Sequence, residues 1–247
     1  MNKLWVSLLY ASIGLVTLVA QDVNTLMERA QKGDASSQNS LGLMYGNGQG
    51  VPQNYVQSMK WYRLAADQGY ASAQYNLGLM YDKGQGVPQD YAQAAKWYRL
   101  AADQGHAAAQ SNLGKMYASG EGVPQDDAQA AKWYRLAADQ GHAAAQFNLG
   151  FAYANGEGVP QDDVQAVKWY RLAADQGVAV AQSNLGFAYA NGEGVTQDYV
   201  QAHMWYNLAA AQGDEDGKKR RDLVAKKMTP QQIAQAQKLA RNWKPKK

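Results

Sequence analysis

The pattern of apolar and polar residues repeats along the chain. The ten residues KWYRLAADQG begin at Lys60, Lys96, Lys132 and Lys168, and a degraded copy, MWYNLAAAQG, begins at Met204. Each start lies 36 residues after the previous one. Self-similarity at a fixed period of this length predicts an array of stacked units, in which every copy has the same structural role.

The decapeptide itself predicts an amphipathic helix. Its alanines and tryptophan recur at helical spacing and share one face. Gly105 should end this helix, because glycine adopts the left-handed conformation without a steric penalty. Lys96 should be solvated, whereas Tyr98 and Leu100 flank the apolar face and should complete its packing. The predicted buried residues are Ala94, Trp97, Ala101 and Ala102.

Another helix is predicted ahead of the decapeptide, separated from it by the loop KGQGVPQD. Gly84 suits the end of the first helix, Pro88 the entry to the second, and Asp90 can cap the second helix's free amides. One helix pair cannot bury its own apolar face, so the copies must stack. The positions shared by all first helices are those of Ala71, Gln74, Leu77, Gly78 and Tyr81.

Four decapeptide copies also carry Arg and Asp at a spacing of four residues. In the fifth copy both partners are replaced together, by Asn207 and Ala211. Joint loss favours an ion pair on the helix surface, worth about 0.2–0.5 kcal/mol; shared ancestry of near-identical copies is the alternative. The four pairs are Arg63–Asp67, Arg99–Asp103, Arg135–Asp139 and Arg171–Asp175.

The full unit resembles the Sel-one-like repeat, a relative of the tetratricopeptide repeat. The residues that carry the resemblance are A-x-x-Q-x-x-LG-x-x-Y, the G-x-GV-x-QD loop and KWY-x-x-AA-x-QG, in five copies from about Asp34 to Gly213. The resemblance implies an all-α, right-handed solenoid of antiparallel helix pairs that serves protein–protein interaction or scaffolding. Cysteine-rich secreted relatives staple each repeat with a disulfide. This chain has no cysteine, so any enzymatic activity of that branch does not transfer.

The flanks complete the expected domain organisation. Residues 21–33 resemble an N-terminal capping helix, residues 34–213 form the five 36-residue repeats, and residues 214–247 resemble basic C-terminal capping helices with a tail. Thr229 and Pro230 should start the last helix. Residues 1–20 carry one charge, Lys3, followed by an apolar run. This run is typical of a cleaved signal peptide, with an uncleaved membrane anchor as the alternative. Either reading predicts a periplasmic or secreted protein.

Charge divides the chain into two parts. From Gln21 to Gly217 there are 12 Lys and Arg against 20 Asp and Glu, and from Lys218 onward there are 11 against one. An acidic body on an exported protein argues against nucleic-acid binding. The basic tail, or an uncleaved N-terminus, could contact a membrane, although a polar terminal cap is needed in any repeat array.

A candidate partner-binding surface comes from positions that differ among the copies. On the first helices these positions cluster on an arc separate from the shared residues. Such helices usually line the concave face of a helix-pair solenoid, so aromatic and aliphatic residues there predict a peptide or protein groove. The alternative is that they fill gaps between repeats. The candidate residues are Tyr75, Leu79, Lys115, Phe147, Phe151 and Phe187.

Other signals do not predict a catalytic, cofactor or metal site. The recurring G-x-G lacks the strand–loop–helix context of a phosphate loop. His106 and His142 have no third ligand nearby in the sequence and are expected to be solvated loop residues. The acidic residues of the later repeats are expected at helix starts, or as a rim that steers a cationic partner; they are Glu121, Asp126, Asp127, Glu157, Asp162, Asp163 and Glu193.

The sequence therefore predicts a non-enzymatic interaction or scaffold module acting outside the cytoplasm. We expect an unidentified protein or peptide partner, no cofactor, no metal and no nucleic acid. Two alternatives stay open: a structural, self-assembling envelope protein, and a cell-wall or β-lactam hydrolase. The hydrolase would need a nucleophile–base pair in a cleft, which the repeat does not offer.

Overall fold

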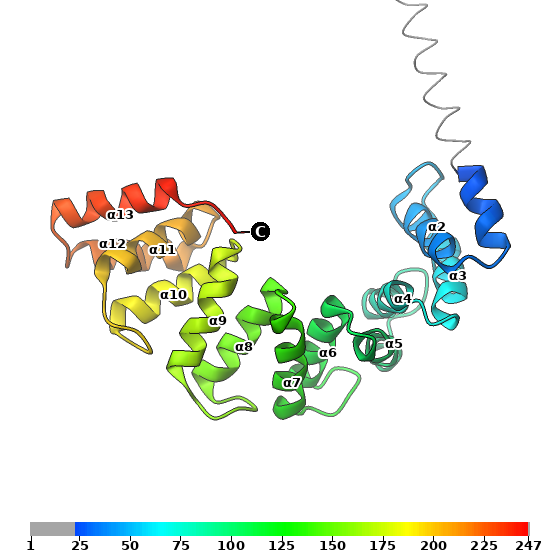
Figure 1. Ribbon diagram of the computed structural model, residues 1–247, viewed down its shortest axis with the longest axis horizontal. Coiled ribbons are helices and arrows are strands. Elements are labelled where there is room, and N and C mark those ends of the chain that lie inside the picture. Colours follow the sequence, from blue (N-terminus) through cyan, green and yellow to red (C-terminus); the bar gives the residue numbers. More distant parts are fainter. Residues whose placement is uncertain (1–22, 247) are drawn as a thin grey trace, which may run out of the picture. The chain divides into compact units, whose positions relative to one another are not determined.

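The computed structural model describes residues 23–246; the predicted signal segment, residues 1–20, lies outside them. All regular structure in residues 23–246 is helical (Figure 1). The helices fall into two compact units. The first runs to Ala109 and includes Glu121–Val123, and the second contains Gln110–Gly120 and continues from Pro124.

The first unit begins with a helix at residues 23–31. Two helix pairs follow, and each helix packs against the next one in the chain. Helix α6 (Ala107–Ser119) starts in this unit and continues into the second. The pairs are α2 (Ala35–Asn47) with α3 (Tyr55–Asp67) and α4 (Ala71–Lys83) with α5 (Tyr91–Asp103).

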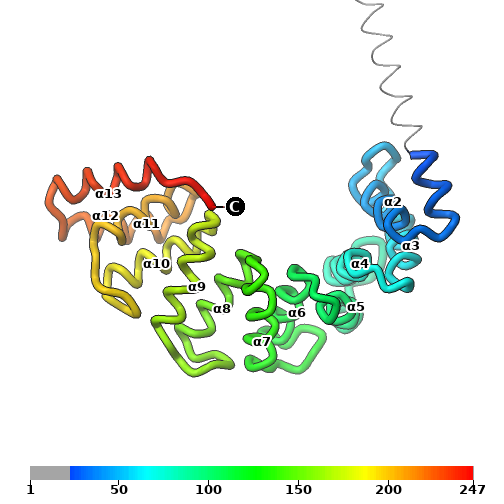
Figure 2. The backbone as a smooth tube through the Cα atoms, viewed as in Figure 1, coloured from blue at the N-terminus to red at the C-terminus, as the bar shows by residue number. Residues whose placement is uncertain are grey.

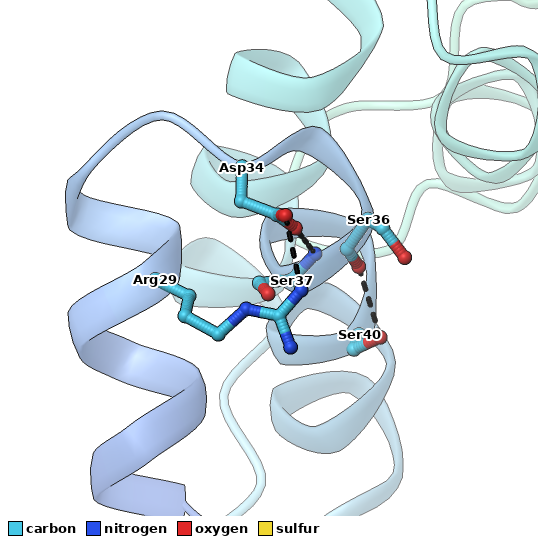
Figure 3. A network of polar contacts seen from close by, with 5 residues as sticks. All are labelled: Arg29, Asp34, Ser36, Ser37 and Ser40. Atoms are coloured by element: carbon cyan, nitrogen blue, oxygen red, sulfur yellow. Dashed lines mark hydrogen bonds and ion pairs between the residues drawn. The ribbon is translucent and has the colours of Figure 1, made fainter.

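A polar network joins the helix at residues 23–31 to the first repeat (Figure 3). The Asp34 carboxylate accepts the Ser37 amide at 2.6 Å, and the Arg29 guanidinium donates to it at 3.2 Å. These contacts, the Ser37 amide first, hold the pKa of Asp34 below its usual value. One turn later the Ser40 hydroxyl donates to the Ser36 carbonyl at 2.9 Å. Asp34 is thus the N-cap of α2.

The second unit continues the same succession and closes it. Helices α7 (Asp127–Asp139), α8 (Ala143–Asn155), α9 (Asp163–Asp175), α10 (Ala179–Asn191) and α11 (Tyr199–Ala211) pack in chain order. Helix α12 (Glu215–Ala225) packs on α10 and α11, and α13 (Pro230–Asn242) packs on α11, as Figure 2 shows in orange and red. The chain is an all-α solenoid of helix pairs, as the sequence predicts.

A glycine in each first helix lets a tyrosine ring of the second helix lie on the helix backbone. A Cβ atom on Gly150 would come within 2.8 Å of Cδ1 of Tyr170, so alanine would collide with the ring. The five tyrosines are buried. The glycines are Gly42, Gly78, Gly114, Gly150 and Gly186, and they face Tyr62, Tyr98, Tyr134, Tyr170 and Tyr206.

Paired glutamines connect the two helices of each repeat. The fully buried Gln182 donates from Nε2 to the Ala174 carbonyl at 3.2 Å, and its Oε1 accepts from Nε2 of Gln212 at 2.9 Å. Both ends of the amide are therefore satisfied without water. The same pairing links Gln38 to Gln68, Gln74 to Gln104, Gln110 to Gln140 and Gln146 to Gln176.

The predicted buried face of the decapeptide is confirmed, except at one flanking residue. Ala94, Trp97, Ala101 and Ala102 are buried, as is Tyr98. Leu100, in contrast, is 40% exposed. At 100° per residue it lies roughly 130° from the centre of the buried face, so the expectation that it completes the packing is wrong.

The decapeptide arginines contact the following repeat. The Arg63 guanidinium donates to the Tyr81 hydroxyl at 2.9 Å, and its Cζ lies 4.7 Å from the centre of the Trp97 ring. This combination of a hydrogen bond and a cation–π contact joins one repeat to the next. Arg135 makes the same contacts with Tyr153 and Trp169, and Arg171 donates to Tyr189.

The ion pair predicted within the decapeptide is wrong for these three arginines. Among the described residues, Arg63, Arg135 and Arg171 form no ion pair with the Asp four positions on. In the fifth copy, the replacement of arginine by Asn207 has a different explanation from the loss of an ion pair. No tyrosine follows there, because the residue 36 positions after Tyr189 is Ala225; Asn207 instead accepts from Arg221 at 3.1 Å.

Candidate functional site

The variable positions of the first helices fall into two groups by exposure. Phe151 on α8 and Phe187 on α10 are 43% and 39% exposed, and Lys115 on α6 is also exposed. Tyr75 and Phe147 are half-buried and pack on other rings. Tyr75 stacks on His106 at 4.7 Å, and Phe147 lies 5.9 Å from Tyr170; Leu79 on α4 is half-buried as well.

The exposed phenylalanines line two adjacent cavities in the second unit. The larger, about 610 Å³, lies between α8, α9, α10 and α12, and the smaller, about 190 Å³, is lined by residues of α6, α7 and α8. Phe151 lines both of them. The cavities are equivalent sites of successive repeats, since Asp127, Tyr134, Asn148, Phe151 and Glu157 of the smaller lie 36 residues before Asp163, Tyr170, Asn184, Phe187 and Glu193 of the larger.

The first unit has a cavity of the same origin with different chemistry. It has a volume of about 280 Å³, and Leu79 occupies the position of the phenylalanines. Tyr55 and Gln85 stand where the later cavities carry carboxylates, and Lys83 also lines this cavity. Equivalent cavities therefore occur in both units, and the residues that line them differ.

The G-x-G loop places one acidic residue at each of the later cavities. Gly156 and Gly158 both have positive φ, at 72° and 69°, and the backbone of Asp127 occupies the space that a Gly158 side chain would need. The loop therefore lies against the start of α7, and Glu157, between the glycines, lines the same cavity as Asp127. The central residue of the loop is a cavity residue rather than part of a phosphate site.

Negative charge in these cavities comes from the carboxylates and not from the tyrosines. Burial raises the pKa of Tyr134 to about 12, with Glu157 and Asp127 adding to the rise. The pKa of Tyr170 is also raised to about 12, first by burial and then by Asp163 and Glu157, against a hydrogen bond from Asn184. Both phenols stay neutral at physiological pH. Within residues 23–246, Asp127, Glu157, Asp163 and Glu193 form no ion pair.

One cation of the chain itself reaches the larger cavity. Arg220 on α12 lines it, and the guanidinium carbon lies 5.0 Å from the centre of the Phe187 ring. Burial raises the pKa of Tyr206, and the hydrogen bond and positive charge of Arg220 partly offset this rise. Sequence reasoning missed this residue. Continuing the 36-residue register beyond Gly213 aligns Arg220 with Asn184 and would have found it.

The histidines are helix caps rather than solvated loop residues. Nδ1 of His142 accepts the Ala145 amide at 3.3 Å, and Nδ1 of His106 accepts the Ala109 amide at 3.2 Å. Both rings are half-buried, so the expectation of solvated loop residues is wrong. Residues 23–246 bring together no group of three His, Asp or Glu that could hold a metal ion. No helix in that range is long and apolar enough to cross a bilayer.

Similar structures have been solved for bacterial repeat proteins. A protective antigen from uropathogenic Escherichia coli, with an SLR fold, is 38% identical with a TM-score of 0.84; the match covers 90% of this chain and 48% of the antigen, so this chain spans about half the antigen's length. A Sel1 repeat protein from Oxalobacter formigenes is 33% identical with a TM-score of 0.78, covering 95% of this chain and 99% of that one.

A third structure supports the fold alone. It is described as a putative sel1 repeat protein from Klebsiella pneumoniae, and it is 23% identical with a TM-score of 0.51 over 82% of this chain and 99% of that one. No curated protein matches the chain. The Sel1 repeat family matches five consecutive segments, residues 35–70, 71–106, 107–142, 143–178 and 179–214. The chain therefore belongs to the Sel1 repeat family.

Proposed function

We propose that this protein is a non-enzymatic interaction module that binds a segment of a partner protein through the first helices of its second unit. The observation that carries the proposal is the exposure of Phe151 and Phe187, 43% and 39%, at the walls of two adjacent cavities. Exposed aromatic side chains beside cavities are typical anchors in protein interfaces. Sel1 repeat proteins are generally protein-interaction scaffolds, which agrees with this role.

The other candidate residues have different parts in this proposal. Tyr75 in the first unit and Phe147 in the second support the exposed residues of their own units, because their rings pack on neighbouring aromatic side chains. Lys115 changes the charge at this position in the second unit, and Leu79 changes the shape of the side chain there in the first unit. We place the protein outside the cytoplasm, in the periplasm or secreted, on the basis of the apolar N-terminal segment. Cell fractionation tests that location, and recovery in the cytosolic fraction would contradict it.

A matched pair of double variants tests the binding face. Phe151→Ser/Phe187→Ser removes two exposed aromatic side chains from the first helices. Leu136→Ser/Leu172→Ser removes two leucines of similar exposure, 41% and 40%, from the second helices α7 and α9. The full wild-type chain and both variants are immobilised and incubated with envelope and exported proteins of the source organism.

The proposal expects a partner that the wild type and the leucine variant retain and the phenylalanine variant does not. Circular dichroism melts must show that all three proteins are folded. Equal retention by both variants would move the interface away from the first helices of the second unit.

A further inference from the structure

We propose that the two adjacent cavities of the second unit that Phe151 lines receive Arg or Lys side chains, so that the partner segment is a cationic, extended peptide. This inference rests on the proposed function and specifies the chemistry of the occupant. The two cavities are adjacent, with Phe151 as a shared wall, so one continuous segment can enter both.

The first argument is uncompensated charge beside an aromatic ring. Asp127 and Glu157 line the smaller cavity, and Asp163 and Glu193 line the larger. None of the four forms an ion pair within the described chain. A guanidinium or ammonium group between two carboxylates and the face of a phenylalanine gains both charge attraction and a cation–π contact.

The second argument is that the chain already places a cation in one such position. Arg220 occupies the position that Asn184 holds one repeat earlier and Asn148 two repeats earlier. Its guanidinium carbon lies 5.0 Å from the centre of the Phe187 ring, at the edge of the larger cavity. Where asparagine stands instead, no side chain of that helix supplies the cation, and a partner can do so.

The third argument is the contrast with the first unit. Its equivalent cavity has Tyr55 and Gln85 at the carboxylate positions, Leu79 at the aromatic one, and Lys83 in its lining. The lining of that cavity contains no carboxylate, so it offers nothing with which a cationic side chain could pair. Specificity for cations should therefore belong to the second unit alone.

Fluorescence anisotropy with defined peptides tests the inference on the full chain. The probe is a fluorescein-labelled heptapeptide amide, Gly-Arg-Leu-Arg-Leu-Arg-Gly, whose alternate side chains share one face when extended. A peptide with citrulline in place of arginine keeps the shape without the charge. We expect the arginine peptide to bind at least tenfold more tightly than the citrulline peptide.

Charge-matched variants separate the cavities from general electrostatic attraction. Asp127→Asn/Glu157→Gln and Asp163→Asn/Glu193→Gln should each weaken binding of the arginine peptide at least fivefold. The control Asp103→Asn/Asp139→Asn makes the same change in net charge at exposed helix ends and should have little effect. Arg220→Asn should strengthen binding, whereas Lys218→Asn, an equal change at an exposed position of α12, should have less effect.

Three results would overturn the inference. The first is equal binding of the arginine and citrulline peptides, and the second is an equal loss in the control variant. The third is a chain that dimerises in light scattering and becomes monomeric in the cavity variants, because a second copy's basic tail would then be the occupant. If the arginine peptide does not bind but a partner is still captured through Phe151 and Phe187, the inference of a cationic occupant is wrong and the proposed function stands.

Discussion

The ring of Tyr170 lies against the backbone of Gly150, so closely that a Cβ atom on the glycine would come within 2.8 Å of ring carbon Cδ1 and 3.2 Å of the Ala166 carbonyl oxygen. The contact sets how near α8 and α9 approach each other. It also fixes the tyrosine that forms the inner wall of the larger cavity. A side chain at this glycine would therefore change both the packing of the repeat and the shape of the cavity.

Gly150→Ala should destabilise the protein despite the better helix propensity of alanine. Alanine gains about 0.5–1 kcal/mol in a helix interior, while overpacking a core costs about 1–3 kcal/mol. Gly46→Ala is the control, because its Cβ would meet no ring and would come no nearer than 3.1 Å to another atom, the Ser58 hydroxyl oxygen. Urea denaturation followed by circular dichroism should show a lower midpoint for Gly150→Ala alone. An equal or higher midpoint would mean that the tyrosine can move aside freely.

Arg135→Lys should lower stability more than Asp139→Asn does. The arginine contacts Tyr153 and Trp169 of the next repeat, and lysine cannot reproduce its planar donor geometry. We expect a loss of about 0.5–2 kcal/mol for the lysine variant and little change for the asparagine variant. Thermal melts of both proteins measure the difference. Equal losses of stability in the two variants would indicate that an ion pair within the decapeptide explains the recurrence of Arg and Asp.

Stability should fall as the pH is lowered through about 6.5. Burial lowers the pKa of His142 from its usual 6.5, and the pKa of His203 is lowered by burial and by Arg221. Between the folded-state pKa and the usual value, the unfolded chain binds more protons than the folded chain. The contribution of the neutral histidines to stability is therefore complete above pH 6.5 and is lost as the pH falls through their folded-state pKa. Urea midpoints at pH 7.5 and 5.0 measure the effect.

His142→Asn separates the cap from its titration. Asparagine retains an N-cap acceptor for the Ala145 amide but does not ionise near neutral pH. The variant should therefore lose less stability between pH 7.5 and 5.0 than the wild type does. An unchanged pH dependence would assign the effect to other groups, His203 among them.

Trp243→Ala should weaken the packing of α13 on α11 at the C-terminal end of the array. The Trp243 ring meets Trp205 edge-on at a centroid distance of 6.3 Å, and aromatic pairs contribute about 0.5–1.5 kcal/mol beyond their buried area. Lys246 pairs with Asp175 at 2.7 Å, but its side chain is 76% exposed, so Lys246→Ala should cost much less. Hydrogen exchange should show faster exchange in α11 and α13 for the tryptophan variant only.

Most of the repeat was predictable from the sequence because its determinants are local. Asp90 caps α5 by accepting the Gln93 amide at 3.0 Å, and Gly84 ends α4 with φ of +65°. Thr229 and Gln232 form a capping box at the start of α13, and Pro230 is its first residue. In each case the side chain acts on backbone groups within a few residues, so its type and spacing carry the information.

Contacts between distant residues could not be predicted in the same way. Arg63 has Asp67 one helical turn away, yet it reaches Tyr81 and Trp97 in the next repeat. The choice depends on the distance between stacked helix pairs, which periodicity does not provide. Exposure of Phe151 beside the half-buried Phe147 also depends on the neighbouring helix, since both positions vary and both lie on the same arc of α8.

Helix α12 continues the register of a first helix, and Arg220 therefore places a cation of the chain itself at the last junction between helix pairs. Insertion or deletion of a whole 36-residue unit would leave that cation in place and would change the number of equivalent cavities by one. Under the proposed function, the length of partner segment that such a protein recognises can then be set by repeat number. Its charge pattern can be set by single substitutions between two loop glycines, which leave the packing of the helices untouched.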